Sequence, residues 1–442
     1  MRERRILLVS HWYAPALHPR AFRWSAVAAR WAAQGHRVEA VCSWAPGLSH
    51  EETIECVRVF RVGGSLLGRL KDRLQKPPAF RAAAGGTTGA PKGASALSGL
   101  AGWLSDAAWK KVRWPDYACL WYFPAVREAR RLAAVAACDA VVTVSDPFTG
   151  HLVGLRLKED SPATPWLADV GDPFSFQDGT PVNNARLHGG RNVSAEREVL
   201  SRVDAVTVTN PALMAEYAAR FPESAAKLHV VPPLLSLNPP PPGSPRLFPE
   251  DGKLRLVFVG TLYRDIRNPA FLLRLFGRLL DTPLSDRLEL HVFGDVNDCG
   301  EYFEGSGEST KGKVHLHGMV GRETVARAMA GAAALVHIGN ATRYQLPSKV
   351  VEYAAAGQPV INIVRVEGDS SMTFFKGHPA VRHIMEEEGA LGGEVVEELA
   401  RFIEDPPSVC PDALARWLEP FQAEAVAAEY GRLLLDKVPR RP

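Results

Sequence analysis

A run of prolines divides this chain into two halves. Residues 238–249 read NPPPPGSPRLFP, and four successive prolines lack the backbone donors that a helix or a central strand needs. Such a run is stiff and extended. On both sides of it, short apolar runs that are typical of buried parallel strands alternate with stretches of helical spacing. The sequence therefore predicts two α/β domains joined by a linker over residues 238–252.

The first half opens with a strand, a helix and a second strand in quick succession. Arg5 to Ser10 (RILLVS) is a short apolar run, Arg20 to Gln34 has helical spacing, and Arg37 to Ser43 (RVEAVCS) is the next apolar run. Strand–helix–strand units of this kind build a doubly wound parallel sheet. We assign residues 1–237 to this domain, with an insertion at about 64–115 where the pattern is lost. Further strands are expected at residues 140–145, 166–170, 205–209 and 228–231.

The second half repeats the alternation after the proline run. A strand at Arg255 to Gly260 (RLVFVG) precedes an amphipathic helix at Pro269 to Leu280. We assign residues 253–419 to this domain and residues 420–442 to a closing helix. Two doubly wound α/β halves joined by a rigid linker face each other across a ligand cleft, at the carboxyl ends of both sheets. Further strands are expected at residues 288–294, 314–318, 333–338 and 359–364.

Composition argues against several other classes of protein. The 442-residue chain is 46% hydrophobic and carries a formal charge of +3, which is too small to indicate nucleic-acid binding. Its six cysteines are dispersed, which favours reduced thiols in a cytosolic protein over a disulfide framework or a zinc site. The sequence contains neither a signal peptide nor a run of about 20 apolar residues that could span a bilayer. We therefore expect a cytoplasmic protein whose only membrane contact is peripheral.

The insertion lacks the pattern of strands and helices. Its centre, residues 83–99, is small, polar and low in complexity. The motif GGTTGAPKG at 85–93 lacks both the preceding strand and the following Ser or Thr that phosphate-binding loops need. A basic amphipathic stretch at 66–74 and a Trp-bearing stretch at 103–114 flank this centre. They indicate a membrane-surface helix or a lid, with a plain surface excursion as the simpler alternative.

Residues 345–359 (QLPSKVVEYAAAGQP) combine features of an anion site and a hydroxyl site. The first backbone N–H groups of a helix are unpaired and carry the positive end of its dipole. Ser348, Lys349 and Val350 lie at this end, and Lys349 adds a mobile cation. Glu352 lies within the first turns, where it can accept hydrogen bonds from sugar hydroxyls. The segment favours a nucleoside diphosphate ligand, and the alternative is a helix cap with surface charges.

The turn after the first strand of the second half also carries cations. Gly260 permits close backbone approach, Thr261 offers a hydroxyl, and Arg264 and Arg267 lie three residues apart. A guanidinium suits bidentate recognition of phosphate. One arginine of the pair can be neutralised by the aspartate between them, and we favour Arg267 as the one that faces the ligand.

Candidate acceptor residues follow the strands of the first half. His18, Pro19 and Arg20 lie in the loop after the first strand, while Asp146 and His151 belong to the later segment DPFTGH. Loops at the carboxyl ends of parallel strands line the cleft, so these residues should face it. The alternative for His151 is a histidine at the start of a helix.

Two aspartates, Asp169 and Asp172, flank a glycine at the end of another strand, in WLADVGDPF. Either carboxylate can contact sugar hydroxyls or steer the proton of an acceptor. The alternatives are a satisfied buried acid for Asp169 and a turn carboxylate for Asp172. No set of histidines, cysteines and carboxylates has metal-ligand spacing, so the sequence predicts no metal site.

Taken together, these segments resemble the GT-B glycosyltransferases, and within them the retaining group 1 enzymes, also called family 4. The resemblance covers almost the whole chain. It implies two Rossmann-like domains, with a nucleotide sugar on the second, an acceptor on the first, and the last helix packed back on the first. The segments that carry it are HWYAPALHPRAFR, SDPFTGHLVGLRLK and PWLADVGDPF in the first half, and FVGTLYRDIRNP and PSKVVEYAAAGQPVI in the second.

The resemblance also implies roles for the candidate residues. Glu352 would hold the ribose, and Lys349 and Arg267 would hold the diphosphate of a UDP or GDP sugar during catalysis. Asp169 and Asp172 are the catalytic candidates beside the acceptor, a glycan or a lipid-linked carrier in bacterial surface polysaccharide synthesis. Neither a metal nor a separate cofactor is expected, because the protein's cations stabilise the leaving diphosphate.

Two features depart from the pattern of this group. Many members carry Glu-x7-Glu, but counting back from Glu352 places Tyr344 at the first position. Many members also have a Gly-Gly pair in the first loop, where this chain reads LHPR at 17–20. Two alternatives therefore stay open: a sugar-nucleotide epimerase of the same fold, and a non-catalytic protein that binds nucleotide or glycan.

Overall fold

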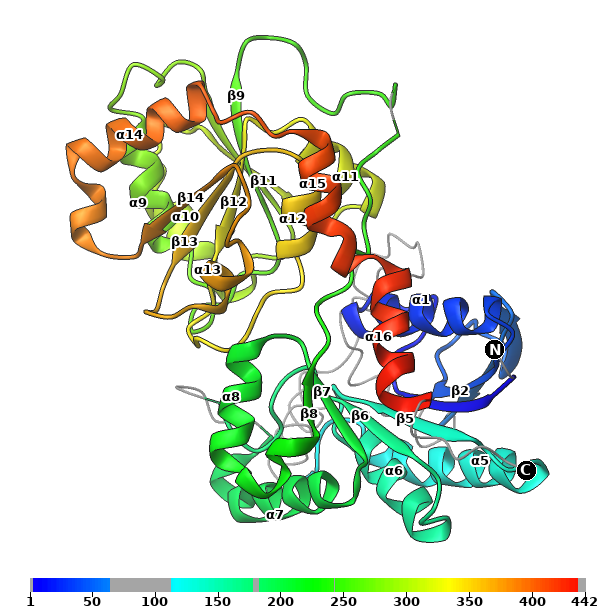
Figure 1. The fold of residues 1–442 in the computed structure, drawn as a ribbon. Helices are drawn as coiled ribbons and strands as arrows, with labels where there is room; N and C mark the ends of the chain where they lie inside the picture. The colour runs from blue at the N-terminus through cyan, green and yellow to red at the C-terminus, as the bar shows by residue number, and fades with distance from the viewer. Residues whose placement is uncertain (1–2, 64–112, 178–182, 242, 436–442) are drawn as a thin grey trace, which may run out of the picture. The chain divides into compact units, whose positions relative to one another are not determined.

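The computed structural model describes residues 3–63, 113–177, 183–241 and 243–435, and the chain divides into two compact units (Figure 1). Unit 1 comprises Met1–Pro232 and Ala423–Pro442, and unit 2 comprises Pro233–Gln422. The predicted insertion at about 64–115 lies outside the described residues, except for its last three positions.

Unit 1 is built on a sheet with the strand order β3-β4-β2-β1-β5-β6-β7-β8. Every pair of neighbouring strands is parallel except β3 and β4, which form an antiparallel edge that the sequence reading missed. The strands are β1 Arg5–Ser10, β2 Arg37–Ser43, β3 Glu51–Ile54, β4 Val57–Val62, β5 Ala140–Val144, β6 Trp166–Asp169, β7 Ala205–Val208 and β8 Leu228–Val230.

The last helix of the chain belongs to unit 1. Figure 1 shows α16 beside α1, and the Trp31 indole N–H donates to the Ala427 carbonyl at 3.0 Å. Tyr430 on α16 is fully buried, which anchors the helix on this unit. The helices of unit 1 are α1 Pro19–Ala33, α5 Tyr122–Val135, α6 Thr149–Asp160, α7 Ala185–Arg202, α8 Pro211–Arg220 and α16 Ala423–Leu435.

Unit 2 is built on an all-parallel sheet with the order β11-β10-β9-β12-β13-β14. The central strands β9, β12 and β13 are nearly continuous buried apolar runs, because helices cover both faces of the sheet there, whereas the edge strands β11 and β14 are more exposed. The sequence reading missed only β14 among these strands. They are β9 Leu254–Val259, β10 Leu288–Phe293, β11 Val314–Gly318, β12 Ala334–Ile338, β13 Val360–Val364 and β14 Val381–Met385.

The helices of unit 2 bury two separate apolar clusters. One cluster joins the sheet to α9 and α14, and the other joins it to α11, α12 and α15. Within the described ranges, no helix combines the length and apolar character that crossing a bilayer requires. The helices are α9 Ala270–Leu279, α10 Gly300–Gly305, α11 Arg322–Ala330, α12 Val350–Ala355, α13 Ser370–Phe374, α14 Gly393–Glu404 and α15 Pro411–Leu418.

The described part of the proline run contains no helix or strand, as its composition predicts. We placed the linker at 238–252, whereas unit 2 already begins at Pro233. The reason is that the Leu235 N–H donates to the Phe421 carbonyl at 2.8 Å, and Ser236 hydrogen-bonds Glu352. The residues just before the prolines are therefore part of unit 2.

Each sheet has one point at which the strand order reverses. In unit 1 it lies between β1 and β5, and in unit 2 between β9 and β12. The loops that follow the two strands at such a point leave in opposite directions, so a crevice opens at the carboxyl ends of the strands. The prediction of two Rossmann-like, doubly wound domains is confirmed.

Candidate functional site

The turn after β9 depends on a close contact between two glycines. A Cβ on Gly294 would lie 1.9 Å from the Gly260 carbonyl oxygen, and the φ angle of Gly294 is +131°, so a larger residue would displace the turn. The turn then closes on itself, because the Arg267 N–H donates to the Tyr263 carbonyl at 2.9 Å. Arg267 thus returns to the end of the strand, where Gly260 and Thr261 lie.

Arg267 joins the two loops at the switch point of unit 2. Its guanidinium donates to the Thr261 carbonyl at 3.1 Å and to the Asn340 side-chain oxygen at 2.9 Å. No carboxylate in the described residues forms an ion pair with it, and its Nε has no hydrogen-bond partner there. Burial lowers the pKa of Arg267, but an arginine remains charged at neutral pH. The result is a half-buried cation with donors to spare.

The second arginine of this turn is placed differently. Arg264 is exposed, forms an ion pair with Glu301 at 2.7 Å and donates to the Asp298 carbonyl at 3.0 Å. Its charge is therefore already neutralised at the surface. The contrast supports the choice of Arg267, although the neutralising carboxylate is Glu301 and not the neighbouring Asp265.

The loop after β12 leads to Lys349, which is the N-cap residue of α12. Lys349 is half-buried, and its ammonium group has no ion pair or hydrogen bond with the described residues. Ser348 before it is exposed, while Val350 after it is fully buried in the core. Ser348 and Lys349 are therefore available to a ligand, and Val350 contributes at most its backbone.

Glu352 on α12 is buried, with only 3% of its surface exposed. Its Oε1 accepts a hydrogen bond from the Ser236 hydroxyl at 2.7 Å, and the Ser236 carbonyl accepts one from Arg322. Its Oε2 has no partner among the described residues. Such an oxygen can accept hydrogen bonds from the hydroxyls of a ligand.

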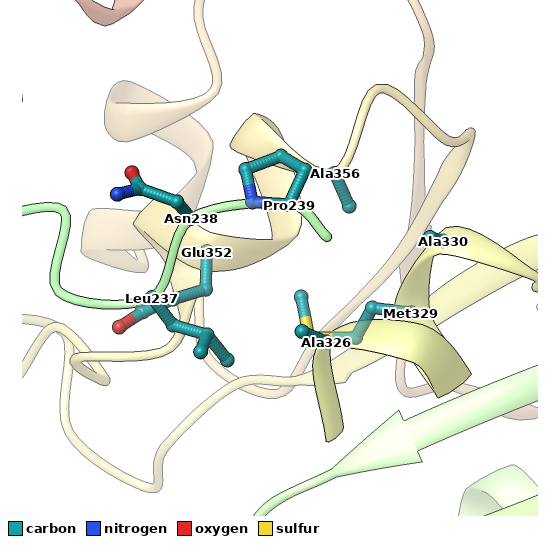
Figure 2. A pocket seen from close by; sticks show the side chains of 8 residues that line it. All are labelled: Leu237, Asn238, Pro239, Ala326, Met329, Ala330, Glu352 and Ala356. Atoms are coloured by element: carbon teal, nitrogen blue, oxygen red, sulfur yellow. The ribbon is translucent and has the colours of Figure 1, made fainter. Parts of the chain in front are cut away.

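Glu352 also lines a pocket of unit 2. Figure 2 shows it together with residues of α11 and of the start of the proline run. The pocket combines apolar walls with one under-used carboxylate, and it is small, with room for about one water molecule. It is lined by Leu237, Asn238, Pro239, Ala326, Met329, Ala330, Glu352 and Ala356.

The sequence reading missed three polar partners of this site. Asn340 binds Arg267, and Ser236 binds Glu352. Asp369 is buried, its Oδ2 has no partner in the described residues, and a Cβ on Gly339 would lie 2.3 Å from that oxygen. Burial raises the pKa of Asp369. Asn340 and Asp369 each follow a strand of the sheet, which is the one signal that could have indicated them.

In unit 1, Asp169 is completely buried and has every lone pair in use. Its Oδ1 accepts from the Tyr430 hydroxyl at 2.6 Å and from the Thr207 hydroxyl at 2.8 Å. Its Oδ2 accepts from the Trp24 indole at 2.8 Å and from the Arg20 guanidinium at 3.4 Å. This arrangement favours the alternative that we left open, a satisfied buried acid.

The pKa of Asp169 reflects these contacts. Burial by itself would raise the pKa, but the positive charges of Arg23 and Arg20 and the hydrogen bonds from Tyr430 and Trp24 lower it below its usual value. The carboxylate is therefore ionised in the folded protein. It joins α1, β7 and α16, which makes it a structural crosslink.

The carboxylates nearer to the surface of unit 1 surround Arg20. The Arg20 guanidinium lies against Gly171, where a Cβ would come within 1.6 Å of it. Asp146 and Asp172 are exposed residues whose charges influence each other. The pKa of Asp146 is raised to about 7, first by burial of its carboxyl among protein atoms and then by Asp116 and Asp172, while Arg20 opposes the shift. Asp146 and Arg20 are thus close enough for their charges to influence each other.

Three other acceptor candidates have structural partners. His18 is the N-cap residue of α1, and its Nδ1 accepts from the Arg20 N–H at 3.2 Å. Pro19 occupies the first position of that helix. His151 is buried in α6, with its Nδ1 2.7 Å from the Thr143 hydroxyl. Burial lowers the pKa of His151 to about 4, so this ring is neutral.

Comparison with known proteins shows which family model and which folds the chain resembles. Residues 253–372 match the family model described as glycosyl transferases group 1. No curated protein sequence matches the chain. The fold is similar to that of sucrose-phosphate synthase from Thermosynechococcus elongatus, with 17% sequence identity, a TM-score of 0.67 and 98% of each chain covered.

Two further solved structures are similar to the chain over nearly its full length. One is HepE from Anabaena in complex with UDP-glucose, with 12% identity, a TM-score of 0.57, and 97% of this chain and 99% of that chain covered. The other is WaaG, a glycosyltransferase involved in lipopolysaccharide biosynthesis, with 13% identity, a TM-score of 0.55 and the same coverage. At these identities the likeness concerns the fold, and it confirms the predicted GT-B class.

Proposed function

We propose that this chain, whose residues 253–372 form a group 1 glycosyltransferase domain, transfers a sugar from a nucleoside-diphosphate donor to an acceptor hydroxyl with retention of anomeric configuration. One observation carries the proposal. Arg267 is a half-buried cation, bound to two neutral oxygens and to no carboxylate in the described residues, at the switch point of a doubly wound sheet. An anion is the ligand that such a cation lacks.

The donor is a UDP or GDP sugar held by unit 2. Arg267 and Lys349 bind the diphosphate, and neither has to break an ion pair with a described residue to do so. The backbone of Gly260 and Thr261 lies beside Arg267. The free carboxylate oxygen of Glu352 accepts the ribose hydroxyls. These contacts account for the cations and the acid without invoking a metal ion.

Transfer breaks the bond between the anomeric carbon and the diphosphate oxygen, and the electron pair stays on the diphosphate. The acceptor oxygen forms the new bond on the same face of the sugar, and its proton passes to the leaving diphosphate. Negative charge therefore builds on the diphosphate in the transition state. Arg267 and Lys349 stabilise this charge from fixed positions, which is the protein's main contribution to the rate.

The acceptor is a glycan or a lipid-linked carrier bound by unit 1, in bacterial surface polysaccharide or glycoconjugate synthesis. Asp146, Asp172 and Arg20 supply the polar groups for its hydroxyls. The likeness to WaaG supports this class of acceptor. The reaction takes place in the cytoplasm, with peripheral contact at the inner face of the membrane.

A non-catalytic role is the second candidate, and Tyr344 is the observation that favours it. This side chain is completely buried at the position where many group 1 enzymes have a glutamate. A protein of this kind would bind the nucleotide or the glycan without turnover.

The test is a calorimetric titration of the protein with UDP and with GDP, without added metal, followed by a transfer assay. We expect micromolar binding of one diphosphate and a loss of affinity of about tenfold, or roughly 1.4 kcal/mol, in Glu352→Gln. Glutamine keeps an acceptor for Ser236 but loses the charge that strengthens the ribose contacts. Glu323→Gln is the matched control, because this glutamate is exposed on α11.

The transfer assay measures release of the nucleoside diphosphate from UDP-glucose or GDP-mannose in the presence of bacterial lipid extract. Release that depends on the extract supports transfer. Binding without release or change of the donor supports the non-catalytic role. Conversion of the donor to its epimer without net release supports the epimerase alternative, and release without extract indicates hydrolysis of the donor. If neither nucleotide binds, the donor site is assigned wrongly.

A further inference from the structure

A histidine-rich group lies on two neighbouring strands of unit 2, outside the proposed donor site. β10 carries Glu289 and His291, and β11 carries His315 and His317. His291 and His315 are directly paired in the parallel register. Residues two apart on a strand project from the same face, so all four side chains belong to one side of the sheet.

The ligand atoms of this group are close together. One donor atom each from Glu289, His291 and His315 lies within 4.8 Å of the others. The His291 Nε2 is 3.3 Å from the Glu289 Oε2, and the His291 Nδ1 is 2.9 Å from the His317 Nε2. The group is accessible from solvent, because His315 and His317 are exposed on β11, the edge strand of the sheet.

We propose that Glu289, His291 and His315 bind a divalent transition-metal ion of the zinc type, with His317 as a positioning residue. Two imidazoles and one carboxylate are the protein ligands of many three-ligand zinc sites, and water completes the tetrahedron. The proposal is independent of glycosyl transfer. It differs from the expectation from sequence, which looked for ligand spacing along the chain and not across paired strands.

The position of the ring proton on His291 determines whether its other nitrogen can bind a metal. A histidine that binds a metal usually donates its other ring N–H to a neighbouring acceptor. His317 offers that acceptor at 2.9 Å, which leaves the lone pair of His291 Nε2 facing the Glu289 carboxylate. Two acceptor atoms 3.3 Å apart repel each other unless a cation or a proton lies between them.

Neighbouring charges do not cancel the carboxylate. The Arg255 Nε lies 3.2 Å from Glu289, but its two terminal nitrogens bind Asp251 at 2.9 and 2.6 Å. Arg255 therefore shares one positive charge between Asp251 and Glu289, so two carboxylates face one guanidinium and negative charge remains for a cation. Zinc–imidazole bonds of about 2.0–2.1 Å require the exposed His315 ring to adjust its position when the ion binds.

The simpler alternative is a chain of hydrogen bonds from Glu289 through His291 to His317. In that arrangement the proton on His291 Nε2 is donated to Glu289, and no metal binds. The two arrangements differ in one measurable property, which is the affinity of the protein for Zn²⁺.

The experiment is a titration of the full-length protein, without an affinity tag and stripped of metal with EDTA, with zinc chloride against a competing chelator. We expect one high-affinity Zn²⁺ per chain and a Zn²⁺-dependent rise in Tm, because the ion joins the edge strand β11 to β10. His315→Ala and Glu289→Gln should each weaken binding by at least about tenfold, and His317→Ala by roughly tenfold.

The controls separate this site from other metal ligands. His188→Ala removes a histidine from α7 in unit 1 and should leave Zn²⁺ binding unchanged. With Co²⁺ as the probe, the visible bands of a tetrahedral site without sulfur-to-metal charge transfer support the proposal, whereas charge-transfer bands indicate binding by cysteines. His315 is exposed and Gln is isosteric with Glu289, so both variants should keep the fold.

Either of two results overturns the proposal. One is the absence of Zn²⁺ binding by the wild-type protein. The other is binding that neither His315→Ala nor Glu289→Gln weakens. Neither result bears on the donor site, because nucleotide binding is measured without added metal.

Discussion

Asp169 in unit 1 and Arg267 in unit 2 are both charged residues near the carboxyl ends of parallel strands, but their surroundings differ. Asp169 accepts four hydrogen bonds from Trp24, Thr207, Tyr430 and Arg20 and has no lone pair to spare. Arg267 donates to two neutral oxygens and keeps an unpartnered Nε. A charge whose contacts are complete maintains the fold, whereas a charge whose contacts are incomplete is available to a ligand.

The energetic reason is the cost of removing a charge from water. That cost is met for Asp169 by the arginines and hydroxyls around it, which also lower its pKa. Arg267 has no ion pair with a described carboxylate, so part of the cost remains until an anion arrives. The comparison predicts that one residue controls stability and the other controls activity.

Asp169→Asn should have the largest effect. We expect a loss of about 3–5 kcal/mol in the free energy of unfolding. The NH2 group of asparagine would face hydrogen-bond donors, and the positive charges of Arg20 and Arg23 would lose their carboxylate partner. Urea denaturation followed by circular dichroism measures it. Asp172→Asn is the control three residues away, and as an exposed position it should change stability by no more than about 0.5 kcal/mol. If both variants lowered the free energy of unfolding equally, the buried contacts of Asp169 would not be the source of its stabilising effect.

The low pKa of Asp169 also predicts how the free energy of unfolding changes with pH. Because the pKa of Asp169 is lowered in the folded protein, its contribution to stability is present above the unfolded pKa of about 3.9. It is lost as the pH falls through the folded value. The difference in unfolding free energy between wild type and Asp169→Asn should therefore shrink in acid and stay constant near neutral pH.

Arg267→Ala should act in the opposite way, on turnover more than on stability. We expect turnover to fall by one to two orders of magnitude, about 1.4–3 kcal/mol, because the diphosphate loses a fixed cation in the transition state. The unfolding free energy should stay close to wild type, since losing two hydrogen bonds is offset by removing a half-buried charge.

Arg264→Ala is the matched control for this prediction. Arg264 lies in the same turn but is exposed and paired with Glu301. Its removal should leave both turnover and the free energy of unfolding close to those of the wild type, because an exposed ion pair contributes little. A larger loss of turnover in Arg264→Ala than in Arg267→Ala would reverse the assignment of the phosphate contact.

Asp146→Asn should give the smallest effect, one that depends on pH. The pKa of Asp146 is raised to about 7, so its contribution to stability is present below its unfolded pKa and is lost as the pH rises through about 7. The variant should thus gain stability relative to wild type as the pH rises from about 4 to about 7, and the difference should stay level at higher pH. Denaturation curves across this range test it, and a flat difference would mean that neither burial nor the charges of Asp116 and Asp172 raise the pKa of this carboxyl in the folded protein.

Much of the fold could be predicted because its signals are local. Short apolar runs separated by helical spacing identified the parallel strands of both units, and the prolines indicated where two domains meet. The strands β3, β4 and β14 were missed. β3 is half-exposed and β14 is only partly buried, whereas β4 is largely buried but two arginines interrupt its apolar residues. Arg267 and Glu352 could be proposed as well, since each lies at a fixed offset from a strand or helix end.

The amino-acid sequence alone determined the two doubly wound sheets, the position of the proline run and the cations after β9 and β12, because periodicity and chain punctuation act over a few residues. Only the tertiary structure decided which charged side chains have all of their hydrogen bonds and ion pairs formed within the protein. Asp169 receives its hydrogen bond from Tyr430, 261 positions away, and Glu352 receives one from Ser236, 116 positions away. The histidines of β10 and β11 likewise meet only through strand register. Such pairings depend on packing across the fold, and no local pattern encodes them.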